Sequence, residues 1–126
     1  LLGLLTGLAQ PALKNPRMGL AAHLEGVMNG TFLLALGAAW PKVRLSARLN
    51  AAAYWTVICG AYGNWAVTML AAALGTAAMT PIASAGFGAG RWQEALVTVG
   101  FVAVGISILV ASVLLLIGFR RQGQEP

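Results

Sequence analysis

Long apolar runs separated by short basic or Pro-containing stretches dominate the chain. The runs cover approximately residues 1–10, 18–40, 50–79 and 93–119. The stretches between them are too short to form a separate domain. A membrane-spanning helix needs about 20 mostly apolar residues, a length that the last three runs reach. The pattern therefore predicts an all-α integral membrane protein, with four transmembrane helices in a bundle that forms one domain over residues 1–126.

The first run is shorter than the others. Residues 1–9 would form a helix about 14 Å long, against a bilayer core about 30 Å thick. We therefore expect the chain to begin partway along its first helix. A signal peptide is not predicted, because a basic segment and a cleavage site are both missing. The stretch 80–92 contains Pro81 and several Gly residues, which predicts an irregular and mobile loop.

Composition supports the membrane assignment. The chain is 59% hydrophobic and 9% charged, whereas soluble domains carry about 25% charged residues. A small soluble domain buries only about two thirds of its surface, so it could not hide this much apolar area. The single cysteine, Cys59, excludes an internal disulfide and a cysteine-based metal cluster.

The net charge of +5 comes from basic residues in the short connections, where topology signals lie, and it does not predict a nucleic-acid partner. With alternating spans, five basic residues lie on one side and three on the other. The larger group predicts the cytoplasmic side of a bacterial inner membrane. The two groups are Lys42, Arg44, Arg48, Arg120 and Arg121, and Lys14, Arg17 and Arg91.

Two ionisable residues lie inside the predicted second span. They are His23, the only histidine, and Glu25, one of three acidic residues. Polar groups at this depth are costly, so they indicate a functional site by default. A neutral imidazole is the commonest metal ligand and can hold a haem iron from one side. A hydrogen bond from His23 to a neighbouring helix, and a Glu25 side chain that reaches interfacial water, are the structural alternatives.

Spacing groups these residues with others on the same helix. Glu25 and Asn29 are four apart and share a face, while His23, Gly26 and Gly30 form a neighbouring stripe. Small residues in that stripe would let a flat ring or another helix approach the backbone.

Asn64 lies near the middle of the third predicted span, where it either orients a substrate or bonds another helix. With one His and no His–Cys motif, a zinc site of three or four protein ligands is not expected. One His suits haem, which brings four nitrogen ligands of its own.

The stretch 15–30 resembles the hydroxylaminobenzene mutase family. It runs Asn-Pro-Arg-Met-Gly-Leu-Ala-Ala-His-Leu-Glu-Gly-Val-Met-Asn-Gly, and Trp40-Pro41 follows. That family consists of small membrane isomerases that move the hydroxyl of an N-aryl hydroxylamine to the ring, giving an aminophenol. A more distant similarity is to styrene oxide isomerase, carried by Ala22, His23, Asn29 and Gly30 on one helix and by Gly63-Asn64 on the next.

The resemblance implies a homotrimer that binds haem b between subunits, with His23 on the iron, and a small aromatic substrate. We then expect Glu25 to act as general base and Asn29 and Asn64 to orient the substrate. Arg17 would pair with a haem propionate.

Two departures from styrene oxide isomerase concern the substrate. Thr68 stands at the position of that family's pocket Tyr, and Glu25 stands where that family has no acid. Both count against an epoxide substrate.

Three other functions stay open. An epoxide-to-aldehyde isomerase would use the same haem. A small proton-coupled exporter would use Glu25 as a proton relay and leave His23 without haem. A haem protein for electron transfer would need a second axial ligand from another subunit.

Overall fold

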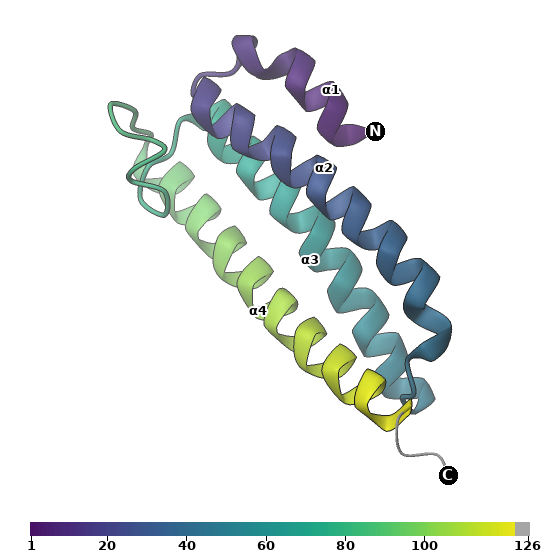
Figure 1. The fold of residues 1–126 in the computed structure, drawn as a ribbon. Helices are drawn as coiled ribbons and strands as arrows, with labels where there is room; N and C mark the ends of the chain where they lie inside the picture. The colour runs from purple at the N-terminus through teal and green to yellow at the C-terminus, as the bar shows by residue number, and fades with distance from the viewer. Residues whose placement is uncertain (123–126) are drawn as a thin grey trace.

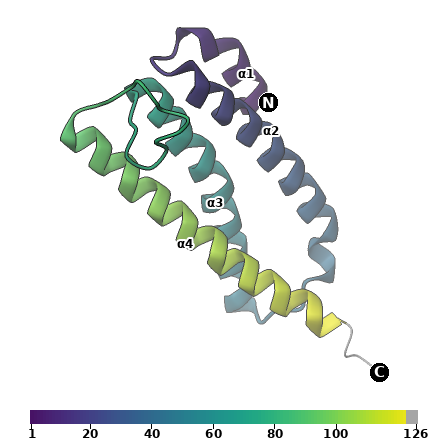
Figure 2. The same ribbon diagram turned by 60° about the vertical axis from the view of Figure 1, so that its left-hand side comes forward.

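A computed structural model describes residues 1–122 of the chain, with side chains for residues 1–120. Within this part the chain forms helices and turns and no strand, which confirms the predicted all-α architecture with four α-helices. The helix α3 lies between α2 and α4, and α1 packs against the first half of α2 (Figures 1 and 2). The elements are α1 (Leu2–Ala9), η1 (Gln10–Ala12), α2 (Pro16–Ala39), η2 (Trp40–Lys42), α3 (Ala47–Leu74) and α4 (Arg91–Gln122).

The ends of α3 and α4 differ from the predicted ones. The expected helix over about 50–79 begins at Ala47 and ends at Leu74. Gly75 follows with φ +69° and donates its N–H to the Ala71 carbonyl, a left-handed cap that ends many helices. The apolar run continues beyond this cap, but apolar composition alone does not extend a helix. The helix α4 begins at Arg91 and reaches Gln122, past the expected range of 93–119.

Asn15 caps the start of α2. Its Oδ1 accepts hydrogen bonds from the N–H groups of Arg17 (3.1 Å) and Met18 (3.2 Å), which satisfies two of the four N–H groups that a helix start leaves unpaired. Pro16 occupies the first helical position, where its missing N–H costs nothing. The sequence Asn-Pro thus fixes where α2 begins.

The same Asn15 joins α2 to α3 and to the segment 75–90. Its backbone N–H donates to the carbonyl of Ala72 at 2.9 Å. Its Nδ2 donates to Ser84 Oγ at 3.1 Å and to the Ala83 carbonyl at 3.4 Å. The side chain is fully buried, so these contacts hold the end of α3 against the start of α2.

Two charged side chains also hold the segment 75–90, which includes most of the mobile loop predicted over 80–92. Lys14 Nζ donates to the carbonyls of Leu74 and Gly88, each at 3.0 Å. The Glu94 carboxylate accepts from the N–H groups of residues 77 and 78 at 2.9–3.2 Å. The segment is therefore a hydrogen-bonded cap over one end of the bundle.

Apolar clusters occupy both ends of the bundle. One lies near the cap and is built from Met18, Ala71, Ala72 and Val97. The other lies at the opposite end and is built from Leu36, Val57, Ala111 and Leu115. The polar residues predicted from the sequence lie on α2 and α3 between the two clusters.

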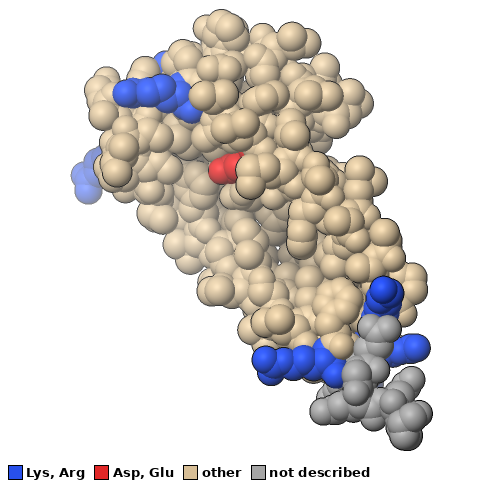
Figure 3. Space-filling view, viewed as in Figure 1, with Lys and Arg blue, Asp and Glu red and all other residues tan. Residues whose placement is uncertain are grey.

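The outer surface of the bundle is mostly apolar. Two helices of the described chain, α3 and α4, are long and apolar enough to cross a bilayer, with mean hydropathies of 1.5 and 2.8. Only 28% and 17% of these windows are buried, unlike the core helices of soluble proteins. The helix α2 has 24 residues but is not among them, because His23, Glu25 and Asn29 lower its hydropathy. Figure 3 shows Lys and Arg at both ends of the molecule and a nearly uncharged surface between them.

Replacing Asn15 by Ala should lower the free energy of unfolding by about 2 kcal/mol, because a helix cap is lost and the Ser84 hydroxyl loses its buried donor. Thermal and denaturant unfolding in detergent would measure this. Asn50→Ala is the matched control, since Asn50 lies in the first turn of α3 and its side chain makes no hydrogen bond with the described residues. Equal losses in both variants would contradict the role of Asn15.

Candidate functional site

His23 is held by a backbone carbonyl of α1. Its Nδ1 lies 2.7 Å from the carbonyl oxygen of Gly3. A carbonyl only accepts, so Nδ1 is the donor, and in the neutral ring with this tautomer Nε2 is the nitrogen that has the lone pair. The hydrogen bonds of the described residues leave Nε2 without a partner. The structural alternative for His23, a hydrogen bond to a neighbouring helix, is therefore present.

Glycines let α1 approach His23 closely. A Cβ on Gly3 would lie 2.5 Å from the backbone N of Val27, and one on Gly26 would lie 2.6 Å from the Cα of Gly3. A Cβ on Gly7 would lie 2.7 Å from Nδ1 of His23. The distances of 2.5 and 2.6 Å end on backbone atoms, so neither Gly3 nor Gly26 could carry a side chain without moving a helix. The Gly3/Gly7 pair, spaced four residues apart, is therefore a packing face of α1.

Trp65 of α3 fixes α1 from a second direction. Its Nε1 donates to Oγ1 of Thr6 at 3.0 Å, and Thr6 is buried. The Trp65 ring also meets Gly26, because a Cβ there would lie 3.0 Å from Cδ1. The helices α1, α2 and α3 therefore meet around Gly26.

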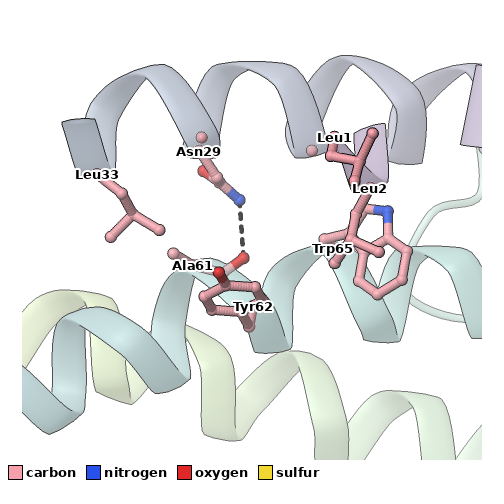
Figure 4. Close-up of a pocket in the computed structure, with 9 residues that line it drawn as sticks. Leu1, Leu2, Asn29, Leu33, Ala61, Tyr62 and Trp65 are labelled. Atoms are coloured by element: carbon pink, nitrogen blue, oxygen red, sulfur yellow. Dashed lines mark hydrogen bonds between the residues drawn. The ribbon is translucent and has the colours of Figure 1, made fainter. Parts of the chain in front are cut away.

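A cavity of about 150 Å³ opens beside this junction (Figure 4). Asn29 points across it and donates from Nδ2 to the Ala61 carbonyl at 3.0 Å, which leaves the amide Oδ1 as a free acceptor. A cavity of this volume can hold a benzene ring. Its lining residues are Leu1, Leu2, Gly26, Asn29, Gly30, Leu33, Ala61, Tyr62 and Trp65.

Glu25 faces α3, where it lies beside the Thr68 hydroxyl. Glu25 Oε2 and Thr68 Oγ1 are both buried without a hydrogen-bond partner in the described chain, and Thr68 is 1% exposed. On α3, Ala61 bonds Asn29 and Thr68 lies beside Glu25. Asn64 lies between these two residues, one turn before Thr68. Glu25 and Asn29 therefore both face α3, and helix spacing places Asn64 on the side of α3 that faces them.

The cavity lies further along α2 than His23 and Glu25, on the side of the helix between the directions of these two residues. Each residue turns an α-helix by about 100°, so Glu25 lies about 200° around α2 from His23. On the same scale, Asn29 lies at about 240° and Gly30 at about 340°. These two cavity-lining residues span the part of the α2 surface that separates His23 from Glu25.

Arg17 lies apart from this group. Its guanidinium donates to the Ala85 carbonyl and lies over the Phe87 ring, with 5.5 Å from Cζ to the ring centroid. It is six residues before His23, or about 9 Å along the helix axis. In the single chain Arg17 holds the segment 75–90 and is exposed.

Three further residues of the site were not singled out from the sequence. Two of them, Tyr62 and Trp65 of α3, line the cavity. Thr68 was noted only as a departure from a related family. The signal for it was its spacing, since Thr68 follows Asn64 by four residues and therefore shares its helix face.

Known proteins with similar sequences cover nearly the whole chain. The family model for styrene oxide isomerase matches residues 1–120. Hydroxylaminobenzene mutase HabB of Ectopseudomonas oleovorans is 45% identical over 121 residues, which cover 95% of this chain and 74% of that protein. Hydroxylaminobenzene mutase HabA of the same organism is 40% identical over 122 residues, or 96% and 90%. No solved structure gives a significant match.

Replacing Gly26 by Ala should separate α1 from His23, because the new methyl would overlap the backbone of Gly3. Overpacking of this kind costs about 1–3 kcal/mol. We expect a lower melting temperature and faster amide hydrogen exchange in residues 2–9. Gly37→Ala on the same helix is the control, since nothing lies within 4 Å of its Cβ position. Unchanged exchange in Gly26→Ala would contradict the close contact.

Proposed function

Because the chain belongs to the styrene oxide isomerase family and is an isomerase, we propose that it converts an N-aryl hydroxylamine into an aminophenol. The identity to two hydroxylaminobenzene mutases supports this substrate class. The observation that carries the proposal is a cavity large enough for one aromatic ring, lined by Asn29, which follows Glu25 by four residues and His23 by six on α2. Hydroxylaminobenzene is accordingly the first substrate to test.

The residues around His23 fit a haem b group. A neutral His whose Nδ1 donates to a carbonyl presents Nε2 to a metal in a fixed orientation. The described residues contain no group of three His, Cys, Asp or Glu side chains that could hold a metal ion, so a cofactor with its own ring ligands suits the site. When bound, ferric haem would supply a Lewis acid for a substrate oxygen.

The roles of the polar side chains follow from their positions. The reaction is an isomerisation in which an N–O bond and a ring C–H bond break, a C–O bond and an N–H bond form, and no electron or proton is gained or lost overall. Glu25 would accept the proton that the ring carbon loses when the ring becomes aromatic again. The free Oδ1 of Asn29 would accept a hydrogen bond from the substrate nitrogen, and Asn64 would orient the substrate from α3.

Arg17 is the proposed partner of a haem propionate. One of its Nη atoms donates to Ala85, and a guanidinium has five N–H donors, so others stay available. Its exposure at the start of α2 supports this role.

We further propose that the bundle spans the bacterial inner membrane as a homotrimer. Large apolar side chains such as Leu34, Val99 and Leu109 are exposed by 68–79%. An apolar surface bounded by basic ends suits a bilayer core and its interfaces. The trimer rests on the resemblance to styrene oxide isomerase.

An epoxide isomerase is the second candidate, favoured by the match to the styrene oxide isomerase model. Styrene oxide and hydroxylaminobenzene assayed with one purified preparation would separate the two functions. A preference for the epoxide would replace the hydroxylamine proposal.

Replacing His23 by Ala should remove haem. The detergent-purified wild type, expressed with ample haem, should show a Soret band, and His23→Ala should lack both the band and isomerase activity. Added imidazole should restore part of the band, because it replaces the missing ring. A wild type without a Soret band, or a variant that retains it, would contradict the role of His23.

Replacing Glu25 by Gln should leave the Soret band intact and lower kcat by about 100-fold, a typical contribution of a general base. Glu94→Gln is the matched control, because its carboxylate caps backbone N–H groups outside the site. That control should lose stability and keep its turnover per folded molecule. Full turnover in Glu25→Gln would remove Glu25 from the mechanism.

A further inference from the structure

Two buried polar atoms face each other across the α2–α3 interface without a partner. They are Oε2 of Glu25 and Oγ1 of Thr68, the two side-chain atoms of this kind in the described chain. The Thr68 side chain lies beside the Glu25 carboxyl, although the two groups do not form a hydrogen bond of good geometry. More than nine in ten buried polar atoms have a partner, so this pair requires an explanation.

On the side of the pair that faces the cap, the neighbouring residues one turn away are apolar. On α2 the residue three before Glu25 is Ala22, and on α3 the residues three and four after Thr68 are Ala71 and Ala72. All three alanines are fully buried. The Thr68 hydroxyl is the donor of α3 that lies beside the Glu25 carboxylate.

We propose that Thr68 is the positioning residue of Glu25, an inference that rests on the proposed function. Its hydroxyl donates a hydrogen bond to Oε2 during the reaction and fixes the carboxylate. The second oxygen, Oε1, then accepts the ring proton. Since a carboxylate rotates freely without such a donor, the hydroxyl determines how often Glu25 is in a productive orientation.

The pair predicts opposite effects on stability and on turnover. Thr68→Val keeps the shape of the side chain and removes a hydroxyl that is unpaired in the resting protein, so the melting temperature should stay the same or rise. Its kcat should fall by about 10- to 100-fold with little change in KM, the effect of losing a hydrogen bond to a charged group. Thr68→Ser retains the hydroxyl and should keep most of the wild-type kcat.

A double-mutant cycle tests whether Thr68 acts through Glu25. We would measure kcat, KM and thermal unfolding with hydroxylaminobenzene for wild type, Glu25→Gln, Thr68→Val, Thr68→Ser and the Glu25→Gln/Thr68→Val double variant. If Thr68 acts through the carboxylate, Thr68→Val should cause no further loss in the Glu25→Gln background. Thr68→Ala takes the place of Thr68→Val if the latter does not fold.

The outcomes separate this inference from the proposed function. An inactive wild type overturns both, and an active Glu25→Gln variant overturns the role of Glu25 and this inference with it. If Glu25→Gln is impaired as expected, three results overturn the inference on Thr68 alone. They are a wild-type kcat in Thr68→Val, a Thr68→Ser variant as slow as Thr68→Val, and losses that multiply in the double variant.

Discussion

The position of α2 against α3 depends on the hydrogen bonds of one buried side chain, Asn15. A buried amide is costly unless its donors and acceptors are paired, and both amide atoms of Asn15 are bonded. Its backbone N–H also bonds α3 through Ala72. Because both helices are regular, this one junction sets the register further along, where Glu25 lies beside Thr68 and Asn29 bonds Ala61. A slip of one residue would rotate every α2 side chain by about 100° and separate these pairs.

The two apolar clusters lie at opposite ends of the bundle, and the polar side chains of α2 lie in a layer between them. Apolar clusters close both ends, and small residues bring the helices together between them. On α3 these include Gly60 and Gly63, whose added Cβ atoms would lie 3.0 Å from Ile108 and Val104 of α4. The polar side chains of α2 are therefore covered by α1 and α3, while α4 contributes mainly apolar surface. This division explains why α2, unlike α3 and α4, has no stretch apolar enough to be a candidate membrane span.

Much of the fold follows from features that are local in the sequence. Apolar runs and their breaks predict the four helices, and four-residue spacing predicts that Glu25 and Asn29 share a face. The end of α3 was missed because Gly75 is one of 16 glycines and only its conformation marks it as a cap. Trp65 and Thr68 were missed because their partners are remote, as in the Trp65–Thr6 bond between residues 59 apart. Pairings of that kind depend on helix register, which composition and spacing do not determine.

The acceptor that orients the His23 ring is a main-chain atom, the Gly3 carbonyl. Every amino acid carries that carbonyl, so no codon change in α1 can delete it. Substitution alters the contact only by moving the helix, and Gly3 is the position where any side chain would do so. The orientation of the imidazole therefore depends on the path of the α1 backbone, and substitutions among the exposed leucines of α1 would leave it unchanged.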